Sequence, residues 1–328
     1  MRKLMFCLLL LAGGLPATAQ EKEAPEQTYN IVVDRNGRGN FRTIGEAIES
    51  IRAFDTQGTI TLFIRDGVYK EKLVLPTYVC NVHIIGESRD KTIITYDDHA
   101  NIDKMGTFRT YTFLIRGNDI TVENLTIENN ALQLGQAVAL HLEGDRIVIR
   151  NCRILGNQDT IYTGRENCRH YFENCHIEGT TDYIFGPSTC WFENCQLLCK
   201  RKSFITAAST PEHIRYGYIF NHCTVSLAPE VPGMALGRPW RPYAMTLFMN
   251  CYLPEGISPA GWNNWGKPEN EQTARYMEFN NSGPGADTSQ RVKWAKILTD
   301  KEATAYTLEN VMKGCDGWMP ATQIKTIK

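Results

Sequence analysis

Residues 170–179, HYFENCHIEG, and residues 190–198, CWFENCQLL, are two versions of one short unit, in which polar and apolar residues alternate around an Asn that is followed by Cys. Alternation with a period of two is typical of β-strands. Further versions lie on both sides of these stretches: ITVENLTIEN from residue 120, IVIRNCRIL from 147, YIFNHCTVS from 218 and TLFMNCYLP from 246. Recurrence of a short unit along the chain indicates a repeat architecture.

The cysteines give the length of the repeat. They are Cys152, Cys175, Cys195, Cys223 and Cys251, with separations of 23, 20, 28 and 28 residues. No long helical pattern lies between the strand-like units, which argues against βαβ units. The repeat therefore predicts an all-β, single-domain parallel β-helix, a solenoid with one coil per repeat.

Neighbouring coils stack about 4.8 Å apart, so equivalent side chains form ladders along the axis. We expect the cysteines to be a ladder of inward, buried free thiols, although stacked neighbours could reach disulfide distance. A metal site is not expected, because no CxxC pair with matching histidines is present.

The two ends of the repeat region look different from its middle. Residues 43–51, TIGEAIESI, have helical spacing and are predicted to cap the N-terminal end of the solenoid, before strands resume with ITLFIRDGVYKEKL from residue 60. KEATAYTLENVMKG at 301–314 is predicted to be a C-terminal helical segment that ends near Gly314. No Pro/Ser-rich linker suggests a second domain, so the β-helix is predicted to span 31–328.

The N-terminus has the three parts of a secretory signal: Arg2 and Lys3, an apolar run at 4–11, and Ala17-Thr18-Ala19. We expect cleavage after Ala19, a flexible segment at 20–30, and export to the periplasm or the medium. The apolar run is shorter than the roughly 20 residues that span a bilayer, so no membrane insertion is expected after cleavage.

Composition excludes some functions. The 328 residues are 42% hydrophobic with a formal net charge of −1. This describes a folded soluble protein and argues against a general nucleic-acid binder, which usually carries a basic excess. Any charged substrate must therefore be bound by local groups.

Three polar residues share one interval: Gln136, Asp159 and Asp182 are 23 residues apart, like Cys152 and Cys175. If the coils have this length, the three side chains stack on one face, and repulsion between the carboxylates raises one pKa. One carboxylic acid beside one carboxylate suits ester hydrolysis. Arg238 follows Asp182 by 56 residues, twice 28, and could reach the same face. Alternatively, each Asp is an ordinary turn residue.

At this point the chain resembles the pectin methylesterases, or pectinesterases, and we identify it as an exported, bacterial member. The similarity runs from about residue 31 to the C-terminus. It consists of DRNGRGNFRTI from residue 34, GVYKE from 67, GTFRTYTF from 106, QAVAL from 136, GNQDTIY from 156, DYIFG from 182, LGRPW from 236, PAGWNNW from 259 and SGPGADTSQRVKW from 282. Each motif is weak by itself, but their order and spacing are specific.

The resemblance implies a right-handed parallel β-helix and hydrolysis of pectin methyl esters without a cofactor. It makes Asp182 the nucleophile and Asp159 the general acid and then base. It makes Gln136 and Gln158 the donors to the oxyanion, and Arg238 the group that orients Asp182 and keeps it charged. Gln158 and Asp159 are adjacent and would face opposite sides of a regular strand, so a strand end or a bulge is expected there.

Aromatic residues are candidates for stacking on the sugar rings of the substrate. By resemblance, Thr107, Phe108 and Trp240 lie in the substrate groove, which Gln136 and Arg238 also contact. Trp262 and Trp265 are further candidates, of which Trp262 is assigned to substrate binding. Tyr162 and Tyr183 are better explained as core residues. The expected partner is methyl-esterified pectin, and a monomer is expected.

Three other functions remain open. A calcium-dependent pectate lyase would need several carboxylates around the ion and a basic residue. A non-catalytic polysaccharide-binding solenoid could share the fold. An esterase on this scaffold could also act on another ester.

Overall fold

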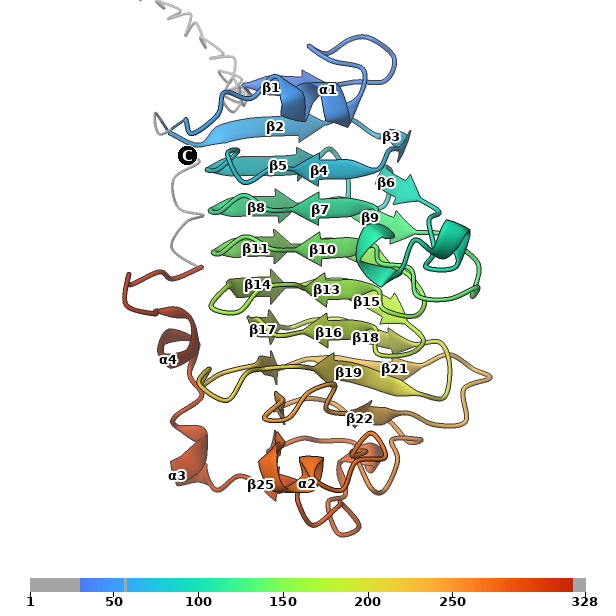
Figure 1. Cartoon of the computed structure of the whole chain (residues 1–328), viewed down its shortest axis with the longest axis vertical. Helices are drawn as coiled ribbons and strands as arrows, with labels where there is room; N and C mark the ends of the chain where they lie inside the picture. Colours follow the sequence, from blue (N-terminus) through green and yellow to red (C-terminus); the bar gives the residue numbers. More distant parts are fainter. Residues whose placement is uncertain (1–29, 56–57, 321–328) are drawn as a thin grey trace, which may run out of the picture.

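The computed structural model describes residues 30–55 and 58–320. The predicted signal peptide at 1–19 and the segment 20–29 lie outside the described residues. The described chain winds through three parallel sheets into a right-handed parallel β-helix, as the repeat predicts (Figure 1). Each coil passes once through each sheet, so sequence neighbours such as β10, β11 and β12 lie in three different sheets.

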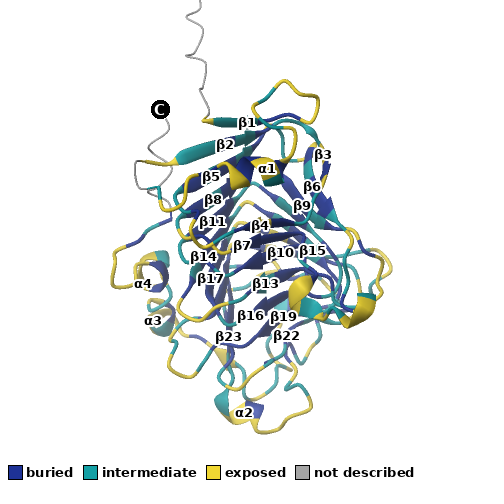
Figure 2. Cartoon of the chain, turned by 45° about the horizontal axis from the view of Figure 1, so that its top comes forward, coloured by how far each residue is buried: buried dark blue, intermediate teal, exposed yellow. Residues whose placement is uncertain are grey.

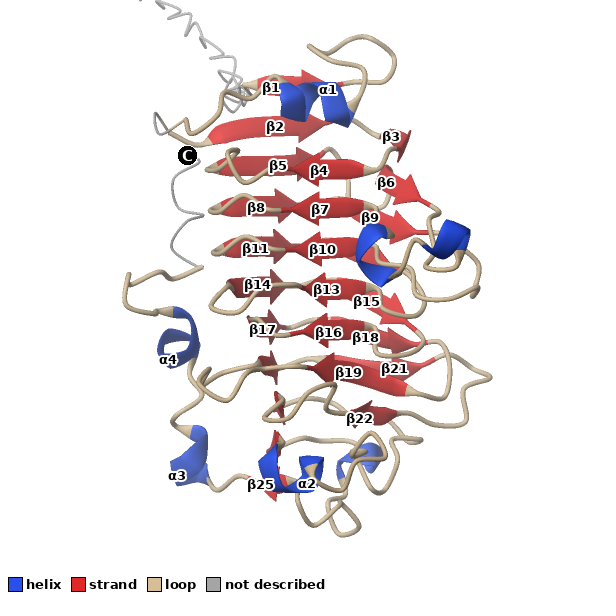
Figure 3. Ribbon diagram, in the orientation of Figure 1, coloured by secondary structure: helices blue, strands red, loops and turns tan. Residues whose placement is uncertain are grey.

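Sheet A has 11 strands in the described chain, and sheets B and C have 7 each (Figure 3). Sheet A contains β1 (Ile31–Val33), β2 (Ile60–Ile64), β5 (Val82–Gly86), β8 (Ile120–Glu123), β11 (Ile147–Arg150), β14 (Arg169–Glu173), β17 (Thr189–Glu193), β20 (Tyr218–Asn221), β23 (Met245–Met249), β24 (Arg275–Phe279) and β25 (Lys296–Ile297). Sheet B contains β3 (Gly67–Lys70), β6 (Thr92–Tyr96), β9 (Thr126–Asn129), β12 (Arg153–Leu155), β15 (His176–Gly179), β18 (Gln196–Cys199) and β21 (Thr224–Leu227). Sheet C contains β4 (Leu73–Leu75), β7 (Phe113–Ile115), β10 (Leu140–Leu142), β13 (Ile161–Thr163), β16 (Ile184–Gly186), β19 (Phe204–Ala208) and β22 (Ala235–Gly237).

The Asn at the centre of each repeat forms the corner between sheet A and sheet B. Asn124, Asn151, Asn174, Asn194, Asn250 and Asn280 all have φ between 46° and 60°. Asn is among the few residues that enter this left-handed region readily, because its short polar side chain bonds locally. The side chains also bond along the axis: Asn151 Nδ2 donates to Asn124 Oδ1 at 2.9 Å, and Asn280 Nδ2 to Asn250 Oδ1 at 2.8 Å. The repeated Asn therefore makes this turn in six coils, and His222, with φ 52°, makes it in the coil after Asn194.

Buried residues recur along the strands of successive coils (Figure 2). Their side chains fill the interior in rows of equivalent positions. One row of sheet A continues through four stacked phenylalanines: Phe172, Phe192, Phe220 and Phe248, whose ring centroids are 4.6, 4.4 and 4.4 Å apart. Adjacent rings are within 13° of parallel. Strict stacking of one residue type on the next is possible because parallel strands keep the same register from coil to coil.

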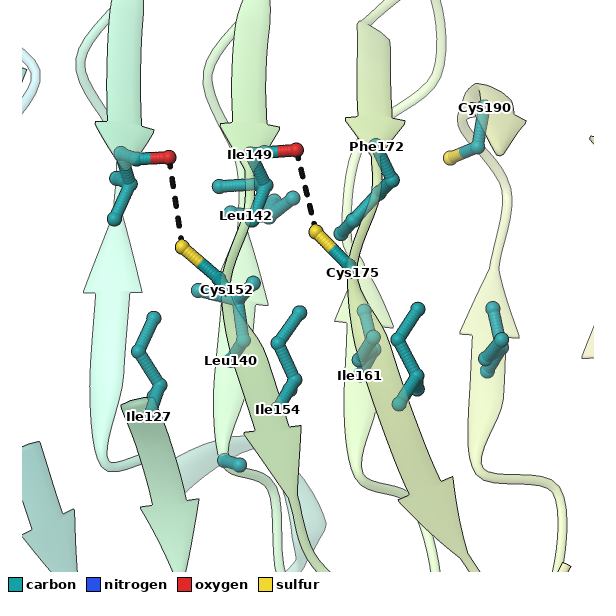
Figure 4. Close-up of a cluster of buried hydrophobic side chains, with 14 of the residues drawn as sticks. Ile127, Leu140, Leu142, Ile149, Cys152, Ile154, Ile161, Phe172, Cys175 and Cys190 are labelled. Atoms are coloured by element: carbon teal, nitrogen blue, oxygen red, sulfur yellow. Dashed lines mark hydrogen bonds between the residues drawn. The ribbon is translucent and has the colours of Figure 1, made fainter. Parts of the chain in front are cut away.

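The cysteine ladder is inward and unbridged, as expected. Cys152, Cys175, Cys195, Cys223 and Cys251 are all buried and free. Each thiol donates to a backbone carbonyl of the preceding coil, as for Cys152 to Val122 at 3.6 Å and Cys175 to Ile149 at 3.4 Å (Figure 4).

The N-terminal end is capped by α1 (Ile44–Glu49), in agreement with the prediction. Thr43 is the N-cap residue, and its side chain accepts a hydrogen bond from the Glu46 N–H. The Glu71 carboxylate accepts from the N–H groups of Ile44 and Gly45 at 3.0 and 2.9 Å. The helix start is thus joined to the strand region that follows.

The predicted C-terminal helical segment is present and consists of two short helices: α3 (Asp300–Ala303) and α4 (Leu308–Met312). The chain breaks between them because Thr307 is extended, with ψ 154°, and caps α4 by accepting from the Asn310 N–H. The predicted end holds, since α4 stops at Met312 and Gly314 has φ +54°. α4 packs against the outer face of sheet A, where Met312 and Trp318 join a buried cluster with Tyr171 and Trp191.

The remaining helices are short and lie in loops. They are η1 (Ile102–Lys104), η2 (Thr107–Arg109), α2 (Asn270–Thr273) and η3 (Pro284–Ala286). No helix within the described ranges is long and apolar enough to cross a membrane.

Phe220→Ala is expected to lower the free energy of unfolding by about 3–5 kcal/mol, because it leaves a cavity between two stacked rings. Urea unfolding followed by circular dichroism measures the change. Phe54→Ala is the matched control, since that ring is 70% exposed. Equal losses for the two variants would contradict the role given to the phenylalanine stack.

Candidate active site

Asp159 and Asp182 lie side by side on adjacent coils. Each comes two residues before a strand of sheet C, and these strands pair with Ile161 opposite Ile184. The Asp159 N–H donates to the Thr181 carbonyl at 3.1 Å, and the Asp182 N–H to the Phe204 carbonyl at 2.8 Å. Both residues have left-handed backbones, with φ 64° and 48°. The shared register therefore places the two carboxylates at the same level of the sheet.

Arg238 directly follows β22 and binds Asp182. Its Nε and Nη2 donate to Oδ1 and Oδ2 of the carboxylate at 3.0 and 2.6 Å. The backbone approaches closely here: a Cβ on Gly237 would lie 2.0 Å from Thr206 Oγ1. A glycine before Arg238 thus allows β22 to sit against β19, and the two-point ion pair fixes the orientation of the Asp182 carboxylate.

Two aromatic rings hold the guanidinium in place. Arg238 Cζ lies 3.8 Å from the centroid of the Trp265 ring and 4.3 Å from that of Phe204. A guanidinium over an aromatic face gains electrostatic attraction and loses freedom to rotate. Arg238 is therefore restrained by Asp182 and by both rings.

The two aspartates differ in their proton affinity. Asp159 is only 8% exposed, and burial, followed by the charge of Asp182, raises its pKa well above the ordinary value, with Arg238 opposing the rise. Burial also raises the pKa of Asp182 above its ordinary value, and the hydrogen bond and charge of Arg238 offset only part of this rise. At a pH between the pKa of Asp182 and the higher pKa of Asp159, Asp159 is a neutral acid while Asp182 is a carboxylate.

Gln136 and Gln158 lie on adjacent coils at equivalent positions, so Gln136 is not aligned with Asp159 and Asp182. The Ala137 N–H donates to the Gln158 carbonyl at 3.0 Å, while the N–H groups of Ala139 and Leu140 both donate to the Thr160 carbonyl, at 2.9 and 3.1 Å. Two residues facing one is the pattern of a β-bulge. The expectation that equal intervals place Gln136 directly over Asp159 is thus wrong, because Leu140 pairs with Ile161 at an interval of 21 and, beyond the bulge, the Ala137 bond to Gln158 puts Ala137 opposite Asp159.

The half-buried side chains of Gln136 and Gln158 face no hydrogen-bonding partner among the described residues. Asp159 lies in a turn before β13, so strict strand alternation does not apply to the pair Gln158 and Asp159. This is the strand end that the sequence requires.

An aromatic strip crosses the outer face of sheet C next to the aspartates; it consists of Phe108, His141, Tyr162, Phe185 and Trp240. Tyr162 lies in register between His141 and Phe185, with ring centroids 4.7 Å from each. Phe108 is 47% exposed and lies 4.9 Å from Tyr162, and Trp240 is 5.8 Å from Phe185. His141 and Phe185 are buried within this strip, so the exposed Phe108 and the half-buried Tyr162 and Trp240 are the rings that offer stacking surfaces to sugar residues.

The structure also locates the other residues named as substrate contacts or core residues. Thr107 is half-buried in η2 beside Phe108, and Tyr183 is a core residue as expected. The assignment of Trp262 to substrate is wrong, because it is 3% exposed, donates to Glu278 at 3.2 Å and contacts Tyr276 in the core.

Tyr162, expected in the core, instead belongs to the aromatic strip, and His141 and Phe185 were not anticipated there. All three are the middle residues of three-residue strands. Aligning the strands of sheet C in the sequence would have revealed their common outward direction.

In the part of the chain that the structure describes, no three His, Cys, Asp or Glu side chains converge in a way that could hold a metal ion.

Comparison with known proteins agrees with this geometry. The family model described as Pectinesterase matches residues 30–315. Pectinesterase 31 of Arabidopsis thaliana is 34% identical over 287 residues, which cover 84% of this chain and 90% of that protein. Several other curated relatives are about twice as long: the chain spans 54% of a probable pectinesterase/pectinesterase inhibitor of Arabidopsis thaliana, at 34% identity.

Solved structures show the same fold. Pectin methylesterase from carrot superposes with a TM-score of 0.85 at 30% identity, covering 92% of this chain and 98% of that one. A pectin methylesterase in complex with a hexasaccharide superposes with a TM-score of 0.77 at 29% identity, covering 90% and 99%. By family model, sequence identity and fold, this chain belongs to the pectinesterase family.

Proposed function

We propose that the chain hydrolyses methyl esters of methyl-esterified galacturonan, releasing methanol and leaving free carboxylates on the polymer. The observation that carries the proposal is the asymmetric pair: Asp182 bound at two points by Arg238, beside Asp159 with its raised pKa. The names of the related enzymes support pectin as the substrate, and one of them is solved with a hexasaccharide.

In the first step Asp182 is the nucleophile. Its carboxylate oxygen attacks the ester carbonyl carbon, and the carbonyl oxygen becomes an oxyanion to which the amides of Gln136 and Gln158 donate. When the oxyanion collapses, the bond to the methoxy oxygen breaks. Asp159 gives its proton to that oxygen, so methanol leaves and an acyl-Asp182 anhydride remains.

In the second step water replaces methanol. Asp159, now ionised, takes a proton from water while the water oxygen attacks the acyl carbon. The bond to Asp182 breaks, the polymer carboxylic acid is released and loses its proton to solvent, and both aspartates return to their starting states. Arg238 stays bound to Asp182 and stabilises it as the leaving carboxylate.

The aromatic strip is the proposed binding surface for the polymer. Phe108 and Trp240, whose ring centroids lie 6.5 Å apart, together stack on the sugar chain near the reacting residue, and Thr107 lies beside Phe108. Trp265 acts by restraining Arg238 rather than by touching sugar.

Localisation and assembly are also proposals. The N-terminal pattern supports export and a monomer is expected. The plant origin of the curated relatives gives no support to a bacterial source.

One assay separates the alternatives. Highly methylated pectin should yield methanol and no unsaturated product, because the proposed chemistry breaks an ester bond and leaves the glycosidic bonds intact. Unsaturated product without methanol would indicate a lyase, and turnover of acyl thioesters in preference to pectin would indicate an esterase of another ester. Binding of pectin without any product would indicate a non-catalytic solenoid.

Asp182→Asn should lower kcat by about four orders of magnitude, since the amide keeps the shape but is not a nucleophile. Methanol release measures the effect, and pectin binding should persist. The control is Asp300→Asn, at an exposed position in α3, which should retain full activity. Activity of Asp182→Asn within tenfold of the parent would refute the nucleophile assignment.

The pH profile should respond to Arg238. Activity needs Asp182 ionised and Asp159 protonated, so kcat/KM should fall on both sides of an optimum. Arg238→Met removes the cation that stabilises the Asp182 carboxylate, which raises the pKa of Asp182. The acidic limb of kcat/KM should therefore move to higher pH by about 1–3 units. An acidic limb that stays in place while activity falls would show that Arg238 does not set the charge of Asp182.

A further inference from the structure

A hollow lies outside the aspartate site, on another side of the β-helix. It has a volume of about 470 Å³ and lies over sheet B, beside the loop that follows β9. This volume falls within the roughly 300–1,000 Å³ range of small-molecule sites. The aromatic strip and the aspartates belong to sheet C, so the mechanism proposed above does not use this hollow.

The floor of the hollow is one outward row of sheet B. Glu128 pairs with Leu155, and Leu155 with Glu178, on three successive coils. The intervening residues, such as Ile154 and Ile177, point into the core. Coil spacing puts the two Glu positions about 10 Å apart, with the apolar Leu155 between them.

The wall is a loop with free polar side chains. Asn130 and Gln133 are exposed, and Leu132 is 74% exposed. Asn157 Nδ2 donates to the Ala131 carbonyl at 3.1 Å and ties the loop to the neighbouring coil. Apolar surface bordered by amides and carboxylates matches a sugar ring, which has an apolar face and a rim of hydroxyl groups.

The charges of the lining select against an acidic sugar. Lys200 Nζ lies 2.8 Å from Glu178 Oε1, so its charge is already paired. Burial alone would raise the pKa of Glu178. Hydrogen bonds with His176 and Lys200 outweigh this effect and lower the pKa to about 2. Glu128 has no ion pair with any described residue. One cation and two carboxylates leave a net charge of 1 − 2 = −1 in the lining.

The hollow is connected to the aspartate site through Asn157, which lies two residues before Asp159. The Asn157 carbonyl accepts from the Thr180 N–H at 3.0 Å and from Thr160 Oγ1 at 3.1 Å. The wall loop leads directly to Gln136. An occupant of the hollow therefore contacts the back of the segments that carry Gln136, Gln158 and Asp159.

We propose that this hollow is a second saccharide-binding site, which takes an uncharged sugar residue and excludes free uronate. Hydroxyl groups of the sugar donate to Glu128 and accept from the amides of Gln133 and Asn130, while its apolar face lies on Leu155. A methyl-esterified galacturonate and a neutral hexose share this chemistry. Binding here is independent of ester hydrolysis.

The test measures binding by titration calorimetry on the full chain carrying Asp182→Asn. The probes are a fully methyl-esterified galacturonan oligosaccharide, its de-esterified form and a neutral galactose oligosaccharide. The hollow is altered by Glu128→Gln with Gln133→Ala, and Glu255→Gln at an exposed distant position is the matched control. Thermal unfolding verifies that each variant is folded.

We expect at least one uncharged probe to bind at the hollow. For the esterified probe, two sites per chain should become one in the Glu128→Gln, Gln133→Ala variant. For the galactose probe, a single site should weaken by about tenfold or more, as expected for lost hydrogen bonds to a charged acceptor. Either result supports the site. Comparison of the esterified probe with the galactose probe then identifies which uncharged sugar the hollow binds.

The proposal fails if the altered hollow and the Glu255→Gln control bind both uncharged probes equally. It also fails if the de-esterified probe binds the hollow as tightly as the uncharged ones. Because binding is measured apart from methanol release, residual activity of Asp182→Asn would overturn the nucleophile assignment without affecting this result.

Discussion

Each coil of this β-helix must return to register with the coil before it, about 4.8 Å along the axis. The left-handed Asn corners meet this requirement between sheets A and B, and the stacked phenylalanines fill the interior that results. The same constraint makes the site. Asp159 and Asp182 are neighbours because Ile161 and Ile184 are paired, and the aromatic strip is continuous because His141, Tyr162 and Phe185 occupy equivalent positions.

Asp159 and Asp182 have different proton affinities because the stacked coils place different groups around them. Burial raises the pKa of both aspartates, but only Asp182 has a guanidinium bound to it. The position of Arg238 depends in turn on Gly237, which allows close strand contact, and on the rings of Trp265 and Phe204. The asymmetry that separates acid from nucleophile in our proposal is thus produced by groups from later coils.

Much of this could be predicted from the sequence, because a period is a local and countable property. The repeated Asn and Cys gave the coils, and the spacing of Asp159 and Asp182 gave their alignment. The 23-residue interval did not hold at Gln136, because Leu140 pairs with Ile161 at an interval of 21 and a bulge at Ala139 and Leu140 then shifts the register, and neither change leaves a signature in residue type. The assignment of Trp262 to substrate failed for another reason. Trp262 faces inward because it contacts Glu278 and Tyr276, which come from a different coil. The hollow over sheet B could not be foreseen either, because a loop and three coils form it together.

The five stacked cysteines are held by hydrogen bonds rather than by disulfide bonds. Each of its five sulfurs is committed to a carbonyl of the coil before it, and burial raises the pKa of Cys152 to about 12. A thiol in that state supplies almost no thiolate, the form that attacks disulfides or oxidants. The five ladder sulfurs therefore hold the coils together as packed side chains with a hydrogen bond each, and no cross-link between them is part of the described fold.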